Sequence, residues 1–371
     1  MLTKFQVKNF KNFSDNFIFD LSSTKNYAFN PECVKNNVIN KSIIQGPNGI
    51  GKSNLGFAIY DISTHLSDKK PVSAEFYENY LNAETGIDIA EFIYNFKFDE
   101  NIVEYSYGKK SPEEVVYEEL KINGKAVVSY NRKREVSATI DLKGAETLNK
   151  DLSHSKISIV KYIASSTVLL DDKTNKVFKE FFNFVDKMIF SRAVWGNTSL
   201  GPDGGSRIIS NDILKRNNLK EFEEFLNNAG VVCKIKAVEQ NGEDVIAFDF
   251  GKKSIEFFKI ASMGTRSLSL FYFWLQRFKI PRESSLLFID EFDAYYHHQL
   301  SKFIVNELKN SPCQVILTTH NTSIMTNDLL RPDCYFLMSK DKIRPIYEFT
   351  DKELREAHNI EKMYRAGAFD D

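Results

Sequence analysis

The sequence predicts an α/β protein with a mostly parallel core sheet, an antiparallel β-subdomain near the N-terminus and an inserted α+β lobe. Short apolar runs that alternate with helical patterns indicate the parallel sheet, as at 285–290, 296–309 and 314–319. Apolar residues that alternate with polar ones, at the start of the chain and again after residue 87, indicate the antiparallel sheet.

The first half of the chain is expected to be mostly β-structure around one short helix. Two strands joined by a turn at 9–16 are followed by a polar stretch and a short buried strand at 42–45. From Lys52 the apolar residues recur at helical spacing. Strands are expected over about 87–165, with Asn-Gly at 123–124 as a strong hairpin signal.

The second half of the chain is expected to begin with helices and to end with alternating strands and helices. Residues 173–228 have helical periodicity, interrupted by a Gly-rich loop at 197–207. A second hairpin is expected to turn at Asn-Gly 241–242. The remaining predicted elements are a helix at 267–278, a strand at 285–290, a helix at 296–309 and strands at 314–319 and 334–338.

Composition places the chain among ordinary globular proteins. Its 371 residues suit two domains, or one domain with a large insertion. The 49 basic and 50 acidic residues give a net charge of −1, which excludes a global positive field for nucleic acid. No apolar run reaches the roughly 18 residues that span a bilayer, so no membrane segment is expected. The four cysteines, Cys33, Cys233, Cys313 and Cys334, lack metal-site spacing, so we expect reduced thiols in a cytoplasmic protein.

A glycine-rich loop between the strand at 42–45 and the following helix is the strongest local signal. Residues 46–53 read GPNGIGKS and match the pattern G-x-x-x-x-G-K-[ST]. Such a loop directs backbone N–H groups at phosphate oxygens, and the helix N-terminus adds positive potential. Lys52 would reach the β- and γ-phosphates, and the Ser53 hydroxyl would bind Mg²⁺. The alternative is a Gly-rich turn with a chance Lys-Ser, which the flanking strand and helix disfavour.

Two acids follow the apolar strand LLFI. Asp290 would hold Mg²⁺ or its waters, and Glu291 would orient and polarise an attacking water. The alternative is an ordinary strand that ends in a solvated acidic turn. The presence of the phosphate loop favours the catalytic interpretation.

Two weaker signals complete the set. His320 follows the strand QVILTT, where it would contact a γ-phosphate, although a lone His after a strand is more often a polar loop residue. The segment SMGTR at 262–266 opens an apolar helix, and its small hydroxylated residues suit either a phosphate contact or a plain N-cap.

Together these motifs resemble an ABC/SMC-type P-loop ATPase head, that is, the ATP-binding cassette head in its structural-maintenance-of-chromosomes branch. More narrowly, the chain is similar to prokaryotic AAA-type ATP-binding proteins of the abortive-infection and overcoming-lysogenisation-defect group. The resemblance covers about 1–65 and 255–340. It rests on the opening LTKFQVKNFKNF and on GPNGIGKSN, ASMGTRSL, LLFIDEFDAYYHHQL, ILTTHNTSIM and the tail EKMYRAGAFDD.

The resemblance implies a composite site in which two heads dimerise head-to-tail around two ATP molecules. Ser262, Gly264 and Thr265 would then contact the γ-phosphate held by the other subunit, and Asp293 would lie in the D-loop at the dimer interface. Lys11 would approach phosphate. The implied catalytic residues are Glu291, Lys52 and His320, and the metal ligands are Ser53 and Asp290. The implied ATP contacts are Gly46, Pro47, Asn48, Gly49, Ile50, Gly51, Lys52, Ser53, Asn54, Lys11, Ser262, Gly264 and Thr265.

The sequence departs from the family pattern in several places. The signature loop of the family, here Ser262 to Thr265, reads SMGT, which disfavours a transporter subunit. No Gln lies near 88–98, where the Q-loop was expected, and Glu91 is a poor substitute. Residues 295–298 read YYHH in place of the usual small-residue and His-Pro pattern. The interval between Ser53 and Ser262 contains no long coiled coil, so a compact head with a modest inserted lobe is expected.

We therefore expect an N-terminal part of the head at 1–70, an inserted region at 71–250, a C-terminal part of the head at 251–345 and a tail at 346–371. The favoured function is an ATP-hydrolysing switch that dimerises around Mg-ATP and controls a protein effector, with the resemblance suggesting anti-phage defence. One alternative is a nucleic-acid-binding ATPase, and another is a transporter or structural ATP-binder. Nucleic acid would bind through the run Lys121, Lys125, Arg132, Lys133 and Arg134, although such a run is usually a solvated face.

Overall fold

The computed structural model describes residues 1–69, 74–134, 137–152, 155–192, 198–200, 209–240, 242–294 and 296–370. Of the loop expected at 197–207, only residues 198–200 belong to the described part. Asn241 of the second expected hairpin turn lies outside the described residues.

One sheet of seven strands is antiparallel throughout and has the order β10-β9-β8-β7-β6-β1-β2. The predicted hairpin at Asn123–Gly124 is confirmed, since both residues have the positive φ that a tight two-residue turn requires. The strands are β1 (Leu2–Lys8), β2 (Phe17–Asp20), β6 (Ala90–Phe98), β7 (Asn101–Ser111), β8 (Glu114–Ile122), β9 (Lys125–Asn131) and β10 (Thr139–Ile140).

The second seven-stranded sheet has the order β12-β11-β16-β17-β5-β18-β19 and is mostly parallel, as predicted. Its five central strands run parallel, and only the two edge strands run against them. The central strands are β5 (Lys41–Gln45), β11 (Ile189–Arg192), β16 (Leu286–Asp290), β17 (Gln314–Thr319) and β18 (Tyr335–Met338), and the edges are β12 (Thr198–Leu200) and β19 (Ile343–Pro345).

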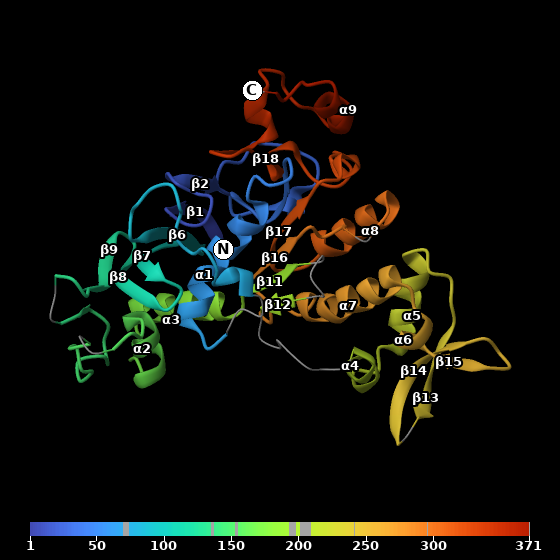
Figure 1. Cartoon of the computed structure of the whole chain (residues 1–371), viewed down its shortest axis with the longest axis horizontal. Coiled ribbons are helices and arrows are strands. Elements are labelled where there is room, and N and C mark those ends of the chain that lie inside the picture. Colours follow the sequence, from blue (N-terminus) through green and yellow to red (C-terminus); the bar gives the residue numbers. More distant parts are fainter. Residues whose placement is uncertain are drawn as a thin grey trace.

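Helix α1 (Lys52–Leu66) is packed between the two sheets (Figure 1). Toward the parallel sheet, Gly56 lies so close to Phe190 and Phe288 that a Cβ would be 2.6 and 2.7 Å from their rings. Toward the antiparallel sheet, the Tyr94 hydroxyl donates to the Ala58 carbonyl at 2.7 Å. The helix that begins with Lys52 is therefore fixed on both sides.

A buried polar network joins α1 to the antiparallel sheet. The Lys109 ammonium lies 2.7 Å from an Asp61 carboxylate oxygen, and both side chains are fully buried. Tyr80 and Tyr107 each donate a hydrogen bond to the same carboxylate at 2.9 Å. A buried charge is tolerated when it is paired and hydrogen-bonded in this way.

The remaining helices cover the sheets and form a lobe at one side of the molecule (Figure 1). Helices α2 (Ile159–Ser166) and α3 (Lys173–Asp186) pack near α1. Helix α7 (Met263–Phe278) extends between the parallel sheet and the lobe, and α8 (His298–Lys309) packs beside it. The lobe consists of α4 (Ile209–Lys215), α5 (Leu219–Asn228), α6 (Phe257–Ile260) and the antiparallel strands β13 (Ile235–Gln240), β14 (Glu243–Asp249) and β15 (Ser254–Glu256).

Short elements complete the chain. A two-stranded ribbon pairs β3 (Val34–Lys35) with β4 (Val38–Ile39), and the tail carries α9 (Ile360–Arg365). The 3-10 helices are η1 (Pro31–Cys33), η2 (Ala74–Phe76), η3 (Thr322–Ile324), η4 (Pro332–Cys334) and η5 (Ile346–Phe349). In the described part of the chain, no helix has the length and apolar character needed to cross a bilayer.

Two expectations about local structure were wrong. The region expected to be strands up to 165 ends in a helix, α2. The helical pattern expected over 173–228 is broken by β11, a four-residue strand in the parallel sheet. A run this short carries no reliable period, and pairing with β16 decides its conformation. The four-part domain division stays a prediction, although β6 to β9 share one sheet with β1 and β2.

Candidate active site

The candidate site lies at the carboxyl ends of the parallel strands. The phosphate loop follows β5, Asp290 ends β16, Thr319 ends β17 and Arg192 ends β11. Parallel pairing aligns these ends, and the register places Arg192 directly opposite Asp290. Ligands of parallel α/β sheets bind at this edge.

The phosphate loop is closed by its own lysine. The Lys52 ammonium donates to the carbonyls of Gly46 and Pro47 at 2.8 and 2.9 Å. Gly51 caps α1 with a φ of 100°, and a Cβ there would collide with the Asn12 side chain. Burial lowers the pKa of Lys52, while nearby carboxylates oppose that shift. The loop therefore holds a buried cation at the start of a helix, an arrangement that suits a phosphate.

The turn at 9–12 supports this loop in a way that sequence reasoning missed. The Asn12 side chain donates to the Ile50 carbonyl at 3.2 Å and accepts from the Asn54 amide at 2.6 Å. Lys11, which was expected to approach phosphate, instead donates to the carbonyls of Glu75 and Glu78, both at 2.7 Å. Burial lowers the pKa of Lys11 to about 8. The predicted phosphate contact of Lys11 stays a prediction.

The two expected metal ligands are in direct contact. The Ser53 hydroxyl donates to an Asp290 carboxylate oxygen at 2.6 Å. The other Asp290 oxygen accepts from the Thr318 hydroxyl at 2.6 Å, and the Asp290 side chain is fully buried. This set of oxygen donors, one of them a carboxylate, suits Mg²⁺. Thr318 was missed because a Thr in an apolar strand carries no distinguishing sequence signal.

A cation that sequence reasoning did not find lies against these ligands. The Arg192 guanidinium is 3.2 Å from the Asp290 carboxylate and 3.4 Å from the Ser53 hydroxyl, and it pairs with Glu75 at 2.6 Å. Arg192 was missed because its strand was expected to be helical. Glu91, the possible but poor Q-loop substitute, is exposed in β6 of the antiparallel sheet, and its role stays a prediction.

Glu291 is held by its backbone at the end of β16. It has a φ of 48°, in the left-handed region, and its N–H donates to the Thr318 hydroxyl at 2.8 Å. A non-glycine residue in this region is strained, and such strain is found at functional sites. Thr318 thus fixes both neighbouring acids, since it also donates to Asp290.

His320 lies between Glu291 and the phosphate loop. Its Nε2 is 3.8 Å from a Glu291 carboxylate oxygen, and its Nδ1 is 3.5 Å from the Lys52 nitrogen. Burial and the Lys52 charge lower the pKa of His320 below 6.5. The imidazole is therefore neutral at pH 7 and able to donate or accept one hydrogen bond at each nitrogen.

An open cavity of about 460 Å³ adjoins these two residues. It is reached by Arg365 from α9, which donates to the Thr322 hydroxyl at 3.5 Å. No motif in the tail predicted this contribution. The cavity is lined by Glu291, Asp293, Ala294, Tyr296, His298, His320, Asn321, Thr322 and Arg365.

The signature residues lie apart from the phosphate loop of the same chain. Ser262 caps α7, and its hydroxyl accepts from the Thr265 N–H at 3.1 Å. Ser262 is exposed and Gly264 is half-buried. This end of α7 is beside the lobe, whereas α1 is between the two sheets (Figure 1). One chain therefore does not bring its signature to its own Lys52.

The five basic residues of the 121–134 run do not form one patch. Lys121 and Lys125 flank the turn of the β8–β9 hairpin, whereas Arg132, Lys133 and Arg134 follow its far end. With β9 seven residues long, the two groups are about 20 Å apart.

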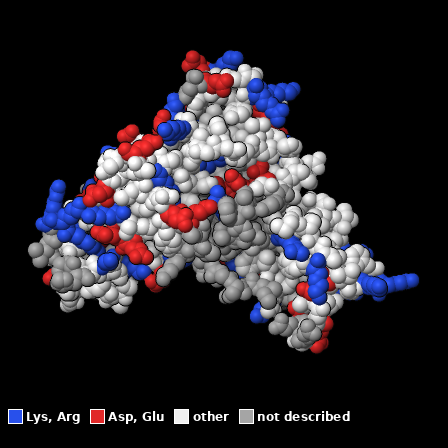
Figure 2. Space-filling model, viewed as in Figure 1, with Lys and Arg blue, Asp and Glu red and all other residues white. Residues whose placement is uncertain are grey.

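Acidic partners also neutralise most of this run. Figure 2 shows acidic side chains among the basic ones at the edge of the molecule that β8 and β9 form. The ion pairs are Lys121 with Glu104 and Glu119, Lys125 with Asp141, and Lys133 with Asp88, while Arg132 donates to the Ile157 carbonyl. The sequence-based patch therefore offers little free positive charge.

Comparison with solved structures found chains of similar arrangement at low sequence identity. An SMC head bound to the C-terminal winged-helix domain of ScpA is 18% identical, with a TM-score of 0.48 over 93% of this chain and 96% of that one. The SMC head domain from Thermotoga maritima is 14% identical, with a TM-score of 0.45 over 93% and 98%. The recombination mediator RecF is 13% identical, with a TM-score of 0.42 over 93% and 98%.

Comparison at the level of sequence gives the family. No curated protein matches this chain. The family described as "AAA domain, putative AbiEii toxin, Type IV TA system" matches residues 42–326, a span from the strand before the phosphate loop to just beyond His320. With most of the chain and all of its central motifs inside that match, the chain belongs to this AAA family.

Proposed function

We propose that this protein is a Mg-ATP-hydrolysing switch whose two copies close head-to-tail around ATP and reopen after hydrolysis. The observation that carries the proposal is the meeting of Lys52, Ser53, Asp290, Glu291 and His320 at one edge of the parallel sheet. A protein that only bound Mg-ATP would need Lys52, Ser53 and Asp290 but not Glu291 or His320. The added acid and imidazole beside an open cavity support turnover.

In this mechanism the chain's own residues bind the nucleotide, orient the attacking water and accept one proton from it. The loop N–H groups and Lys52 bind the phosphates, and Lys52 offsets negative charge as the terminal phosphoryl group leaves. Glu291 accepts a proton from the attacking water. His320, neutral at pH 7, hydrogen-bonds near the same point and keeps that water in line. Thr318 holds both acids in place, because its hydroxyl accepts from the Glu291 N–H and donates to the Asp290 carboxylate.

The donor set fits a magnesium ion. Ser53 and Asp290 would hold it, with Thr318 orienting the carboxylate. When bound, the ion neutralises phosphate charge. Arg192 contacts both of these residues and pairs with Glu75, so its guanidinium would lie beside the ion.

Dimerisation is supported by the position of the signature. Ser262 is exposed and Gly264 is half-buried at the start of α7, an end of the helix that Figure 1 places away from α1. A second copy would bring these groups to the terminal phosphate, so nucleotide would join two surfaces that otherwise stay separate. The helix N-terminus with its capping hydroxyl suits that contact.

The proposed role of the switch is control of a protein effector in anti-phage defence, in the cytoplasm. The family description, which names a putative toxin and a toxin–antitoxin system, supports control of a toxic partner. The four cysteines are free thiols, as suits a reducing compartment. A nucleic-acid-processing ATPase has less support, because the predicted basic run is divided and ion-paired.

The test compares the mass in solution of wild type and Glu291→Gln, each with and without Mg-ATP, with ATP turnover measured in the same samples. We expect Glu291→Gln to dimerise only with ATP and to lose turnover by about 10²–10⁴-fold, the usual contribution of a general base. Glu283→Gln, which removes the same charge from an exposed loop, should behave as wild type.

Two outcomes would contradict the proposal. Glu291→Gln that stays monomeric at saturating ATP would exclude the composite site. Full turnover in Glu291→Gln would exclude Glu291 as the base. A Ser262→Arg variant separates the two claims, since it should block the dimer while leaving ATP binding to the monomer intact.

A further inference from the structure

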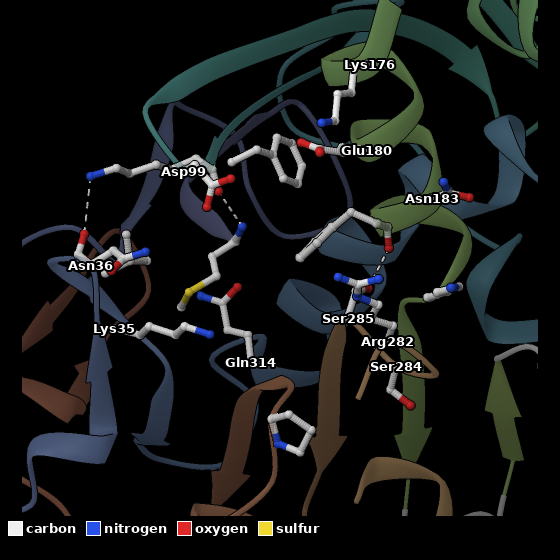
Figure 3. A pocket seen from close by; sticks show the side chains of 17 residues that line it. Lys35, Asn36, Asp99, Lys176, Glu180, Asn183, Arg282, Ser284, Ser285 and Gln314 are labelled. Atoms are coloured by element: carbon white, nitrogen blue, oxygen red, sulfur yellow. Dashed lines mark hydrogen bonds between the residues drawn. The ribbon is translucent and has the colours of Figure 1, made fainter. Parts of the chain in front are cut away.

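A second and larger cavity lies at the opposite end of the parallel sheet from the candidate active site. Its volume is about 690 Å³. Ser285 immediately precedes β16, and Gln314 begins β17, so both residues mark the amino ends of strands whose carboxyl ends carry Asp290 and Thr319. Figure 3 shows α3 along one side of this cavity and the segment before β16 on another.

Cationic side chains dominate the charge of this cavity. The five are Lys35, Lys97, Lys176, Lys187 and Arg282, from four segments of the chain, since Lys176 lies in α3 and Lys187 directly follows that helix. The lining acids are Asp99 and Glu180, so basic side chains outnumber acidic ones by three. The whole chain has a net charge of −1, so the cavity concentrates positive charge against the overall balance.

Within the described part of the chain, these five cations form no ion pair with an acid, in contrast to most of the basic run at 121–134. Of the five, the Lys97 ammonium donates to the Asn36 carbonyl at 3.4 Å. Like charges that share one hollow repel each other over distances shorter than the Debye length of about 8 Å. An anion in the cavity would relieve this repulsion.

The other lining groups narrow the chemistry of that anion. Asn36, Asn183 and the two acids offer hydrogen-bond partners for hydroxyl or amino groups, as Figure 3 shows around the cavity. The rings of Phe98 and Phe184, with centroids 5.8 Å apart, provide an apolar wall. The volume lies within the ~300–1,000 Å³ typical of small-molecule sites.

We infer that this cavity binds a phosphorylated small molecule of nucleotide type, at a site separate from the candidate active site. The lysines and Arg282 would hold its phosphates, the amides and acids its hydroxyl or amino groups, and the phenylalanines its apolar part. A single strand of nucleic acid fits less well, because the cations surround one hollow instead of following a groove. This inference does not depend on ATP hydrolysis by the chain.

The first test uses inorganic tripolyphosphate as the probe, titrated calorimetrically in metal-free buffer. The background is Lys52→Ala, which removes the cation of the phosphate loop. We expect one remaining site per chain, and at least tenfold weaker binding when Lys187→Gln and Arg282→Gln are added. The matched control adds Lys121→Gln and Lys125→Gln, which remove two charges from the ion-paired run and should leave the affinity unchanged.

A second pair of substitutions and a competitor complete the test. Lys35→Gln with Lys176→Gln should weaken the probe similarly, which guards against a folding defect in one variant. Both pairs, placed in the chain with Lys52 intact, should keep wild-type affinity for Mg-ATP at the phosphate loop, so failure of the ATP site is distinguishable. No probe binding to Lys52→Ala, or binding unaffected by either pair, would overturn the inference. A 12-nucleotide single-stranded DNA that outcompetes the probe 100-fold would overturn it in favour of nucleic acid.

Discussion

The buried pair of Lys109 and Asp61 allows a worked prediction. Lys109→Met keeps the length of the side chain but removes the ammonium 2.7 Å from the Asp61 carboxylate, at a position where both are fully buried. Removing one partner of a buried pair costs about 3–5 kcal/mol, because the other charge stays uncompensated. Tyr80 and Tyr107 still donate to Asp61, so we expect the lower part of that range, about 3 kcal/mol.

The assay is urea unfolding followed by circular dichroism, with the variants compared at one pH and salt concentration. The matched control is Lys125→Met, which breaks the ion pair with Asp141 on the surface, where the two side chains are 74% and 58% exposed. Exposed pairs contribute about 0–1 kcal/mol. The reasoning predicts a difference of at least about 2 kcal/mol between the two variants.

Equal effects of Lys109→Met and Lys125→Met would refute the claim that this network fixes α1 between the sheets. A second readout follows from geometry. Asp61 is eight residues along α1 from Ser53, or about 12 Å, so ATP affinity should change far less than stability. If Lys109→Met lost much of its ATP affinity at unchanged stability, the network would act on the nucleotide site and not on the packing of α1.

Three further predictions concern pH, the acids and the tail. Burial holds the pKa of His65 well below 6.5, so the unfolded chain takes up a proton that the native chain does not. Native stability should therefore fall as pH drops below about 6.5, and His65→Gln should show a smaller fall in urea titrations at pH 5 and 7. Thr318→Val removes hydrogen bonds to Asp290 and Glu291 and should lower kcat at least tenfold at little change in KM; unchanged kcat would exclude the positioning role. Arg365→Ala removes the tail's cation from the cavity beside Glu291 and should weaken ATP turnover in steady-state kinetics, whereas unchanged turnover would make the tail contact structural only.

Local sequence determined the candidate phosphate loop and the strands that carry the candidate site. The pattern at 46–53 fixes a glycine-rich turn between a strand and a helix, because only such a turn permits the φ of 100° at Gly51. The apolar run before Asp290 predicts a buried parallel strand, and hairpin chemistry at Asn123–Gly124 predicts the antiparallel turn. These features depend on neighbours a few residues apart, which a sequence contains in full.

Tertiary structure alone decided which distant side chains meet. Arg192 joins Asp290 because β11 pairs with β16, although its segment was expected to be helical and is too short to carry a reliable period. Arg365 reaches the cavity near Glu291 because the tail folds back on η3. The same limit applies to charge. A run of bases reads as a patch in sequence, but carboxylates pair with three of its five members. The cavity at Lys187 instead gathers cations from four segments, and none of them forms an ion pair within the described part of the chain. Contacts across such distances depend on packing of whole elements, which no local pattern encodes.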